Sequence, residues 1–137
     1  DEGRPDGSII IVVATDAPLL PHQLKRLAKR TSLGLGALGS IAGEGSGDIF
    51  VAFSTPNPGL KSFDPEAVPR AMQMLPNEGL NPLFAATTQA TEEAIINAMI
   101  AAQTMEGADG VRVPRLPHRE LRSILAKYNR LGGPPAR

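Results

Sequence analysis

The chain has 137 residues, with 14 Lys and Arg against 14 Asp and Glu, and a hydrophobic share of 42%. This length suits one domain or one part of a larger assembly, and the hydrophobic share lies far above that of disordered chains. The balanced charge excludes a global field that would draw the chain to nucleic-acid phosphates or acidic membranes. The absence of Cys excludes disulfides, thiolate metal ligands and a thiol nucleophile.

Apolar and aromatic residues set two further limits. The longest wholly apolar run covers residues 9–14, whereas a membrane span needs about 20 residues. Four Phe, one Tyr and no Trp offer little material for stacking on nucleic-acid bases. The sequence therefore predicts a soluble protein with neither a nucleic acid nor a membrane as partner, and it leaves the compartment open.

The first part of the chain predicts a strand, a helix and a second strand. Residues 8–14, SIIIVVA, form an apolar run without alternation, which predicts a strand buried on both faces. Asp16 and Pro21 signal the start of a helix, which we expect to stop at Gly34. Its apolar positions recur with helical spacing at Leu20, Leu24, Leu27, Ala28 and Thr31. Residues 48–54, DIFVAFS, predict the second strand.

A proline-rich stretch follows the second strand. Residues 56–82 contain six prolines and predict a long irregular excursion, with one short helical turn near Met72. Loops of this length are commonly functional or pack on another part of the protein. We expect this one to shape the mouth of a pocket or to form a subunit contact.

The remainder predicts two helices around a short strand. The longest helix covers residues 82–105, with Asn81 as its cap and Pro82 at its first position. Turn residues close it at 106–110, a short VRV strand follows, and a last helix begins near Pro117. The final residues, 131–137, predict a frayed tail. Since two or three strands cannot form a sheet covered on both faces, we expect something outside this chain to complete a mixed α and β fold.

Three patterns that suggest chemistry have weak support. Gly34, Gly36 and Gly39 match GxGxxG, but a helix precedes them where a dinucleotide site needs a strand. His22 and His118 each follow a Pro near a predicted helix start and have no ligand at helical spacing, so we expect no metal and no cofactor. From residue 112 onward, seven basic residues accompany one acid, Glu120. That excess indicates a solvated helix face or a contact with an acidic partner.

The junction between Gly7 and Ser8 offers a specific chemistry. If this peptide bond is cut, Ser8 becomes an N-terminus that carries a hydroxyl nucleophile and an α-amine in one residue. An α-amine titrates near about 7.7–8.0, so it can accept the hydroxyl proton without a histidine. In the uncut chain the same hydroxyl could attack the carbonyl of Gly7, because glycine leaves room for the approach.

Several separated segments share one resemblance. They are, in order, GSIIIVVATDAPLLPHQLKRLAKRTSLGLGALGS, GSGDIFVAFST, ATEEAIINAMIAAQTMEGADG and VPRLPH. Over residues 7–118 the chain resembles the C-terminal subunit of the self-processing L-aminopeptidase/D-esterase/D-amidase family, called DmpA-like, which includes the β-peptidyl aminopeptidases. The resemblance implies an α/β fold of the N-terminal-nucleophile-hydrolase type, a four-layer αββα sandwich. Residues 1–7 would be the leader and residues 8–137 the catalytic β subunit.

The resemblance also assigns site residues by position. Ser8 matches the family's nucleophile, which is exposed when the precursor cleaves itself between Gly7 and Ser8. Ser46 and Asp48, in GSGD, match a Ser and an acid that orient the nucleophile's amine, although the family more often has Glu at the position of Asp48. Residues 46 and 48 point the same way in an extended chain, so both could face Ser8.

The resemblance implies a reaction and partners as well. The reaction is hydrolysis of the N-terminal residue from peptides, amides or esters through an acyl-enzyme. The α subunit of the same precursor would supply an Asn and a Tyr for the oxyanion, and the αβ units would assemble as a tetramer. One alternative is an unprocessed member or fragment that serves as a binding or assembly module. A second, the ornithine acetyltransferase class, uses Thr as its nucleophile, so Ser8 argues against it.

Overall fold

The computed structural model describes residues 7–57 and 68–132. Predictions for residues 1–6, for 58–67 within the excursion and for 133–137 of the tail lie outside the described residues. The chain forms two compact units, residues 1–93 and 94–137. Among the described helices, none combines the length and the apolar character that crossing a bilayer requires.

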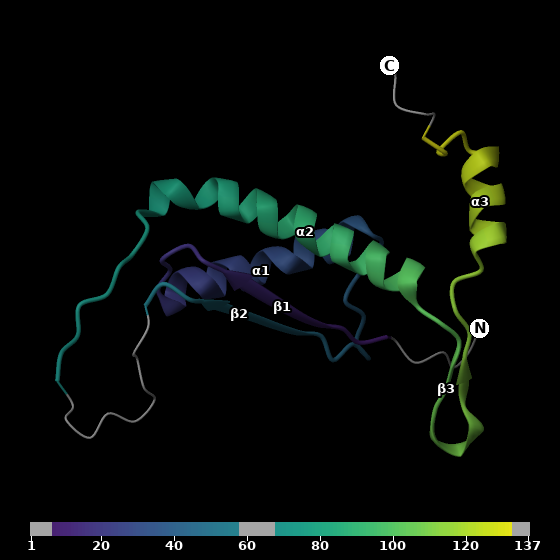
Figure 1. The fold of residues 1–137 in the computed structure, drawn as a ribbon, viewed down its shortest axis with the longest axis horizontal. Helices are drawn as coiled ribbons and strands as arrows, with labels where there is room; N and C mark the ends of the chain where they lie inside the picture. The colour runs from purple at the N-terminus through teal and green to yellow at the C-terminus, as the bar shows by residue number, and fades with distance from the viewer. Residues whose placement is uncertain (1–6, 58–67, 133–137) are drawn as a thin grey trace. The chain divides into compact units, whose positions relative to one another are not determined.

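Two parallel strands and the helix between them organise the first unit (Figure 1). Strand β1 (Ile10–Thr15) pairs with β2 (Ile49–Ser54) in a register that sets Ile10 against Ile49. Helix α1 (Pro21–Ala37) connects them, as parallel strands require a long crossover. Both predicted strands and the first predicted helix are confirmed, with boundaries shifted by a few residues.

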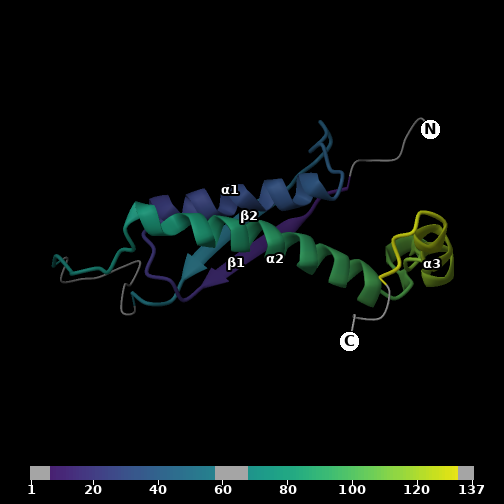
Figure 2. The ribbon, with the colours of Figure 1, turned by 90° about the horizontal axis from the view of Figure 1, so that it is seen from above.

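The helices α1 and α2 (Leu80–Ala101) cover one face of this sheet (Figure 2). The buried core lies between the layers and consists of Leu19, Leu27 and Leu80. Half-buried Val13 of β1 and Ala52 of β2 pack against it from the sheet. The first turn of α2 therefore packs on the sheet through Leu80, which belongs to this core.

Gly34 does not end the first helix, which corrects the sequence prediction. Helix α1 continues to Ala37, and Gly34 is buried inside it. A Cβ at Gly34 would lie 2.6 Å from the backbone O of Thr88 and 2.9 Å from Cβ of Thr91, both on α2. The glycine therefore permits the close approach of the two helices.

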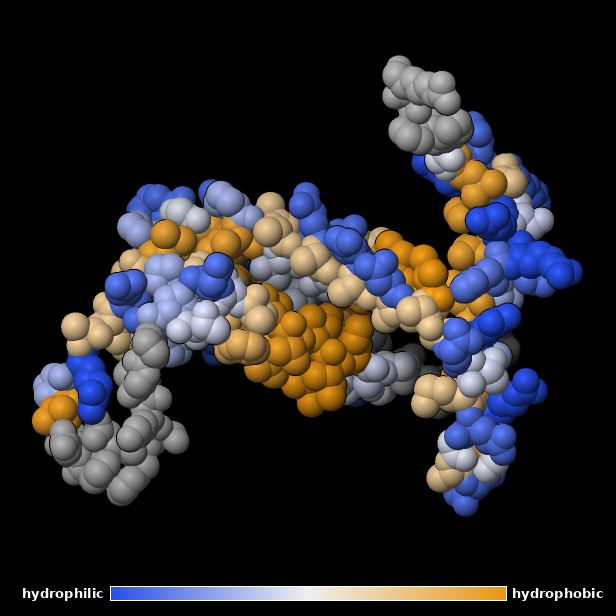
Figure 3. Space-filling view, viewed as in Figure 1, coloured by the Kyte–Doolittle hydropathy of each residue, from blue (hydrophilic) through white to orange (hydrophobic). Residues whose placement is uncertain are grey.

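The other face of the sheet is open in this chain, so the prediction of strands buried on both faces is wrong here. Along each strand exposed and half-buried residues alternate. Ile10 is 69% exposed, Val12 is 59% exposed, and Ile49, Val51 and Phe53 share that face. Figure 3 shows apolar atoms gathered beside α2 in the region of the strands. This apolar surface agrees with the expectation that other segments complete the fold.

The described ends of the excursion are fixed to the first unit. The side-chain amide of Asn57 donates to the backbone O of Gln73 and accepts from its N–H, at 3.1 and 2.9 Å. The backbone N–H of Leu75 donates to the O of Pro18 at 2.7 Å. A short 3₁₀ turn lies at η1 (Asn77–Gly79) instead of near Met72, which corrects the prediction.

These contacts place the excursion relative to the strands. Asn57 follows the end of β2, and Pro18 follows the end of β1. Ser8 lies before the start of β1, at the opposite end, which is about 20 Å away for six residues at ~3.3 Å each. The described ends of the excursion therefore lie at the end of the sheet away from Ser8, and its two expected roles stay predictions.

The second unit begins with the last turns of α2, which ends at Ala101 where the sequence predicted 105. Met105 belongs instead to β3 (Met105–Glu106), which pairs antiparallel with β4 (Arg112–Val113) around η2 (Ala108–Gly110). Helix α3 (His118–Lys127) follows. The turn, the short strand and the last helix are therefore confirmed.

Candidate active site

Ser8 lies directly before β1, next to the segment that precedes β2. The backbone N–H of Gly47 donates to Oγ of Ser8 at 3.0 Å. The two residues are 39 positions apart in the sequence, and the parallel pairing of the strands brings them together. The Ser8 hydroxyl is thus tied to the GSGD segment in which the sequence placed two further site residues.

Asp48 also reaches the start of β1. Its Oδ1 accepts a hydrogen bond from the backbone N–H of Ile9 at 2.9 Å, and the N–H of Ile49 donates to the O of Ile9 at 2.9 Å. Asp48 therefore extends the hydrogen-bond pattern of the two strands by one residue, with a side-chain oxygen in place of a backbone oxygen. Its carboxylate bonds the residue after Ser8, and not the nitrogen of Ser8 that the resemblance assigned to it.

Ser46 lies in the turn that precedes β2. Its backbone N–H donates to the O of Gly43 at 2.9 Å. Ser46 and Asp48 are half-buried, whereas Gly47 between them is exposed, which agrees with the alternation expected for an extended segment. The sequence did not single out Gly47, although its place between the two candidates in GSGD was a usable signal.

The surroundings of Ser8 leave room for a reaction. Ser8 and Gly7 are exposed, and a Cβ at Gly7 would meet no heavy atom within 4 Å. Beside Asp48 there is a cavity of about 240 Å³, lined also by Leu35, Ile41 and Phe50. The lining of this cavity also includes Ser32, Gly36 and Ser40, and it does not include Ser8.

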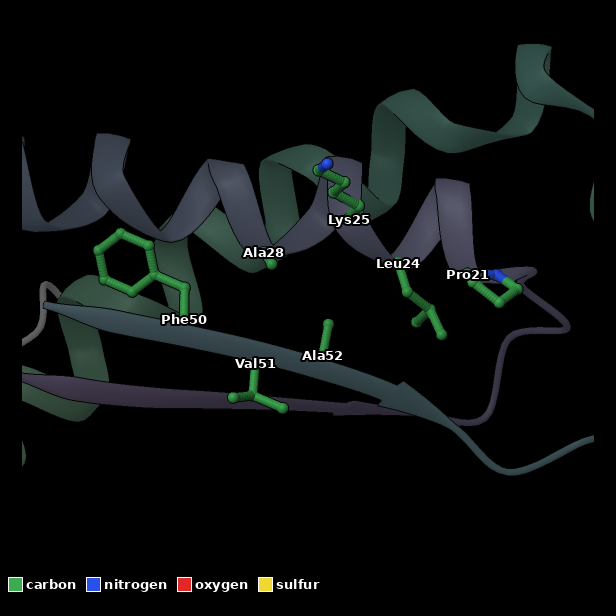
Figure 4. A pocket seen from close by; sticks show the side chains of 7 residues that line it. All are labelled: Pro21, Leu24, Lys25, Ala28, Phe50, Val51 and Ala52. Atoms are coloured by element: carbon green, nitrogen blue, oxygen red, sulfur yellow. The ribbon is translucent and has the colours of Figure 1, made fainter. Parts of the chain in front are cut away.

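A larger cavity of about 470 Å³ lies between α1 and β2. Figure 4 shows Phe50 and Ala52 pointing from the strand toward Leu24 and Ala28 of the helix. Lys25 is the one charged residue in its lining. The other residues of this lining are apolar.

The glycine pattern and the two histidines each have a local setting in the structure. Gly34 and Gly36 lie inside α1, so the GxGxxG match has no strand before it. His22 is exposed in the first turn of α1, and Nε2 of His118 lies 3.1 Å from the backbone O of Ile100. In residues 7–57 and 68–132, no three His, Asp or Glu side chains gather to hold a metal ion.

The sequence of this chain matches a known protein family. The profile of peptidase family S58 matches residues 1–113. The chain belongs to peptidase family S58. This S58 chain is similar to the beta-peptidyl aminopeptidase BapA of Sphingosinicella microcystinivorans, with 56% identity over 92% of the chain. It is also similar to BapA of Sphingosinicella xenopeptidilytica, with 43% identity over 91% of the chain.

Solved structures show the same relationship. The S58 chain matches the L-aminopeptidase D-Ala-esterase/amidase of Ochrobactrum anthropi at 44% identity and a TM-score of 0.75, over 91% of the chain and 35% of that protein. That enzyme is described as a prototype of the serine aminopeptidases and a new variant of the Ntn hydrolase fold. A Burkholderia beta-aminopeptidase matches at 40% identity and a TM-score of 0.78, over 93% of the chain and 36% of its own length. The expected fold type is confirmed.

The S58 chain spans 31% of the length of the curated relatives that it matches. The chain therefore corresponds to about a third of each of these relatives. The expectation of a subunit-like part agrees with this coverage and with the open face of the sheet.

Proposed function

We propose that this chain is the nucleophile-bearing β portion of a self-cleaving N-terminal serine aminopeptidase. The observation that supports the proposal most directly is the 3.0 Å hydrogen bond between the Ser8 hydroxyl and Gly47, within GSGD. Membership of family S58 and the aminopeptidase names of its relatives support the reaction class.

The first step is cleavage of the precursor. Oγ of Ser8 attacks the carbonyl carbon of Gly7, the bond from that carbon to the nitrogen of Ser8 breaks, and the nitrogen takes a proton. The product is an ester between Gly7 and Ser8. Water then hydrolyses the ester, which leaves a carboxylate on Gly7 and a free amine on Ser8. The open space beside Gly7 admits that water.

The same hydroxyl then acts on substrates. Oγ attacks the carbonyl of the substrate's N-terminal residue, and the Ser8 amine accepts the hydroxyl proton and passes it to the leaving amine. Water hydrolyses the acyl-enzyme and restores Ser8. Ser46 and Asp48 are the residues that we propose hold the amine in position, with the Asp48 carboxylate one residue away at Ile9.

The partners follow from the same proposal. The α portion of the precursor covers the apolar face formed by β1 and β2 and supplies the oxyanion donors. The substrates are small peptides, amides or esters with a free N-terminus, and the assembly is a tetramer of αβ units. Without the α portion the chain is inactive, since a lost oxyanion donor costs about 10²–10³ in rate.

Intact-mass measurement on the complete protein tests the proposal. We expect a species that begins at Ser8 and that releases amines from amino-acid anilides. Ser8→Ala should stay uncut and inactive. Ser123→Ala, which changes an exposed serine of α3, is the matched control and should be cut and active.

Two results would contradict the proposal. Turnover by Ser8→Ala would remove Ser8 from the mechanism. A stable, uncut and inactive wild-type protein would favour the alternative of a binding or assembly module.

A further inference from the structure

We infer that the backbone N–H of Gly47 is a positioning donor for the nucleophile, and that residue 47 must be glycine to keep the Ser8 hydroxyl in its reactive place. The inference rests on the proposed function of Ser8. It concerns the backbone N–H of Gly47 and the lack of a side chain at this residue, and both affect Oγ of Ser8.

The hydrogen bond fixes the direction of the Ser8 hydroxyl. Oγ of Ser8 accepts the N–H of Gly47 at 3.0 Å, a normal length for such a bond. Accepting this bond uses one lone pair of Oγ and leaves its own proton free for transfer to a base. The second lone pair remains for attack on a carbonyl carbon. A donor at this position also stabilises negative charge that develops on Oγ as the proton leaves.

The glycine is required for space and not for backbone conformation. Gly47 is absent from the glycines with positive φ, which are Gly39 and Gly110 among the described residues. A Cβ at residue 47 would lie 3.3 Å from Oγ of Ser8 and 4.0 Å from its Cβ. At 3.3 Å one of the atoms must move by a few tenths of an ångström. Any larger side chain would therefore press on the nucleophile itself.

The strand ladder makes this contact rigid. Asp48, the next residue, holds Ile9 through its carboxylate, and Ile49 holds Ile9 through its backbone. Ser8 and Gly47 are thus each one residue from a hydrogen-bonded ladder position. If Oγ moves, the backbone of Ser8 cannot move with it unless these hydrogen bonds break. A methyl group at residue 47 therefore shifts the nucleophile relative to its target.

Gly47→Ala in the complete protein tests the inference. We expect precursor cleavage and kcat to fall about tenfold or more, because small displacements of reacting atoms have large effects on rate. KM should stay within about twofold, since the change acts on the nucleophile and not on the substrate. Gly132→Ala is the matched control, because its added Cβ would meet no heavy atom within 4 Å and Gly132 lies far along the chain from the Ser8 segment. It should keep wild-type rates.

A second measurement addresses the hydrogen bond without changing residue 47. Ser8→Ala removes the acceptor, so amide hydrogen exchange at Gly47 should become faster by about tenfold or more. Exchange at Ile49, whose N–H is bonded to Ile9, should stay unchanged and serves as the internal control. This comparison decides the inference even if Gly47→Ala fails to fold.

The outcomes separate the inference from the proposed function. If Ser8→Ala is inactive while Gly47→Ala has wild-type rates, or a raised KM with unchanged kcat, Ser8 is the nucleophile and the role of Gly47 is refuted. Unchanged exchange at Gly47 in Ser8→Ala likewise overturns the inference. Activity of Ser8→Ala would overturn the proposed function itself.

Discussion

Asp48 accepts the backbone N–H of Ile9 at 2.9 Å, so a carboxylate performs the role of a strand partner at the start of the sheet. The same residue lies directly after Gly47, which contacts Ser8. Asp48 therefore fixes the backbone one residue after Ser8, the nucleophile of the proposed function.

Substitutions of Asp48 can separate the acceptor from the charge. Asp48→Ala leaves the Ile9 N–H without its partner, and we expect the free energy of unfolding to fall by about 1–3 kcal/mol. Asp48→Asn keeps a side-chain oxygen that can accept, so it should lose less than half of that. Chemical denaturation of both variants checks the order. Equal losses would show that the charge, and not the acceptor, stabilises this end of the sheet.

Two glycines of α1 should respond in opposite directions to alanine. Gly34→Ala brings a Cβ to 2.6 Å from the O of Thr88, which requires the two helices to separate, and we expect a loss of about 1–3 kcal/mol. Gly36→Ala adds a Cβ in open space and should stabilise by up to about 1 kcal/mol through helix propensity. Thermal unfolding distinguishes them. A neutral Gly34→Ala would mean that α1 and α2 do not approach closely there.

Gln23 should be important for stability although it is polar. It is fully buried, accepts from the N–H of Leu20, and donates to the O of Leu75 and Oδ1 of Asn77. Gln23→Ala removes these bonds and should cost about 2–4 kcal/mol, since buried groups are left unpaired.

Gln73→Ala is the matched control for Gln23. Its hydrogen bonds to Asn57 use the backbone, and its side chain is exposed, so the change should stay within about 0.5 kcal/mol. Urea titration of both variants gives the comparison. Similar losses in the two would contradict the role of the buried amide.

The open face of the sheet predicts that polar substitutions on it lower the stability of the complete protein. Val12→Asn changes a residue that is 59% exposed in this chain, yet we expect a loss of about 1–3 kcal/mol because the proposed α portion would cover it there. Lys29→Asn, at an exposed position of α1, should have little effect. If Val12→Asn is equally neutral by thermal unfolding, this face is not covered.

The pH dependence of turnover tests the base. The Ser8 amine accepts a proton only when it is neutral, so the rate should rise as pH rises through the amine's pKa. For an ordinary α-amine this range lies near about 7.7–8.0. A pH–rate profile of the mature protein checks the direction. A rate that falls with rising pH across this range would exclude the amine as base.

Local patterns predicted most of the elements, because they depend on neighbours in the sequence. Residues 8–14 and 48–54 gave both strands of the sheet, and Pro117 marked the start of the last helix. The resemblance supplied Ser8, Ser46 and Asp48 as candidates. The structure brings Gly47 of that segment to the Ser8 hydroxyl and Asp48 to the backbone of Ile9.

The errors arose where tertiary contacts decide. Gly34 is a typical helix stop by itself, but packing against Thr88 and Thr91 keeps α1 helical through it. Val12 is 59% exposed, and the apolar run in which it lies does not reveal which face of its strand is covered. Gly47 has no side chain to suggest chemistry, so its place between Ser46 and Asp48 was its one sequence signal, and its bond to Ser8 depends on the pairing of the strands.

The register of the two strands has a consequence for timing during biosynthesis. The hydroxyl of Ser8 meets its donor only after residues separated by a whole helix have paired, so in the proposed self-cleavage an incompletely folded precursor lacks the arrangement needed for the cut. Cleavage by this route would take place only in a folded chain, and a misfolded chain would retain its leader.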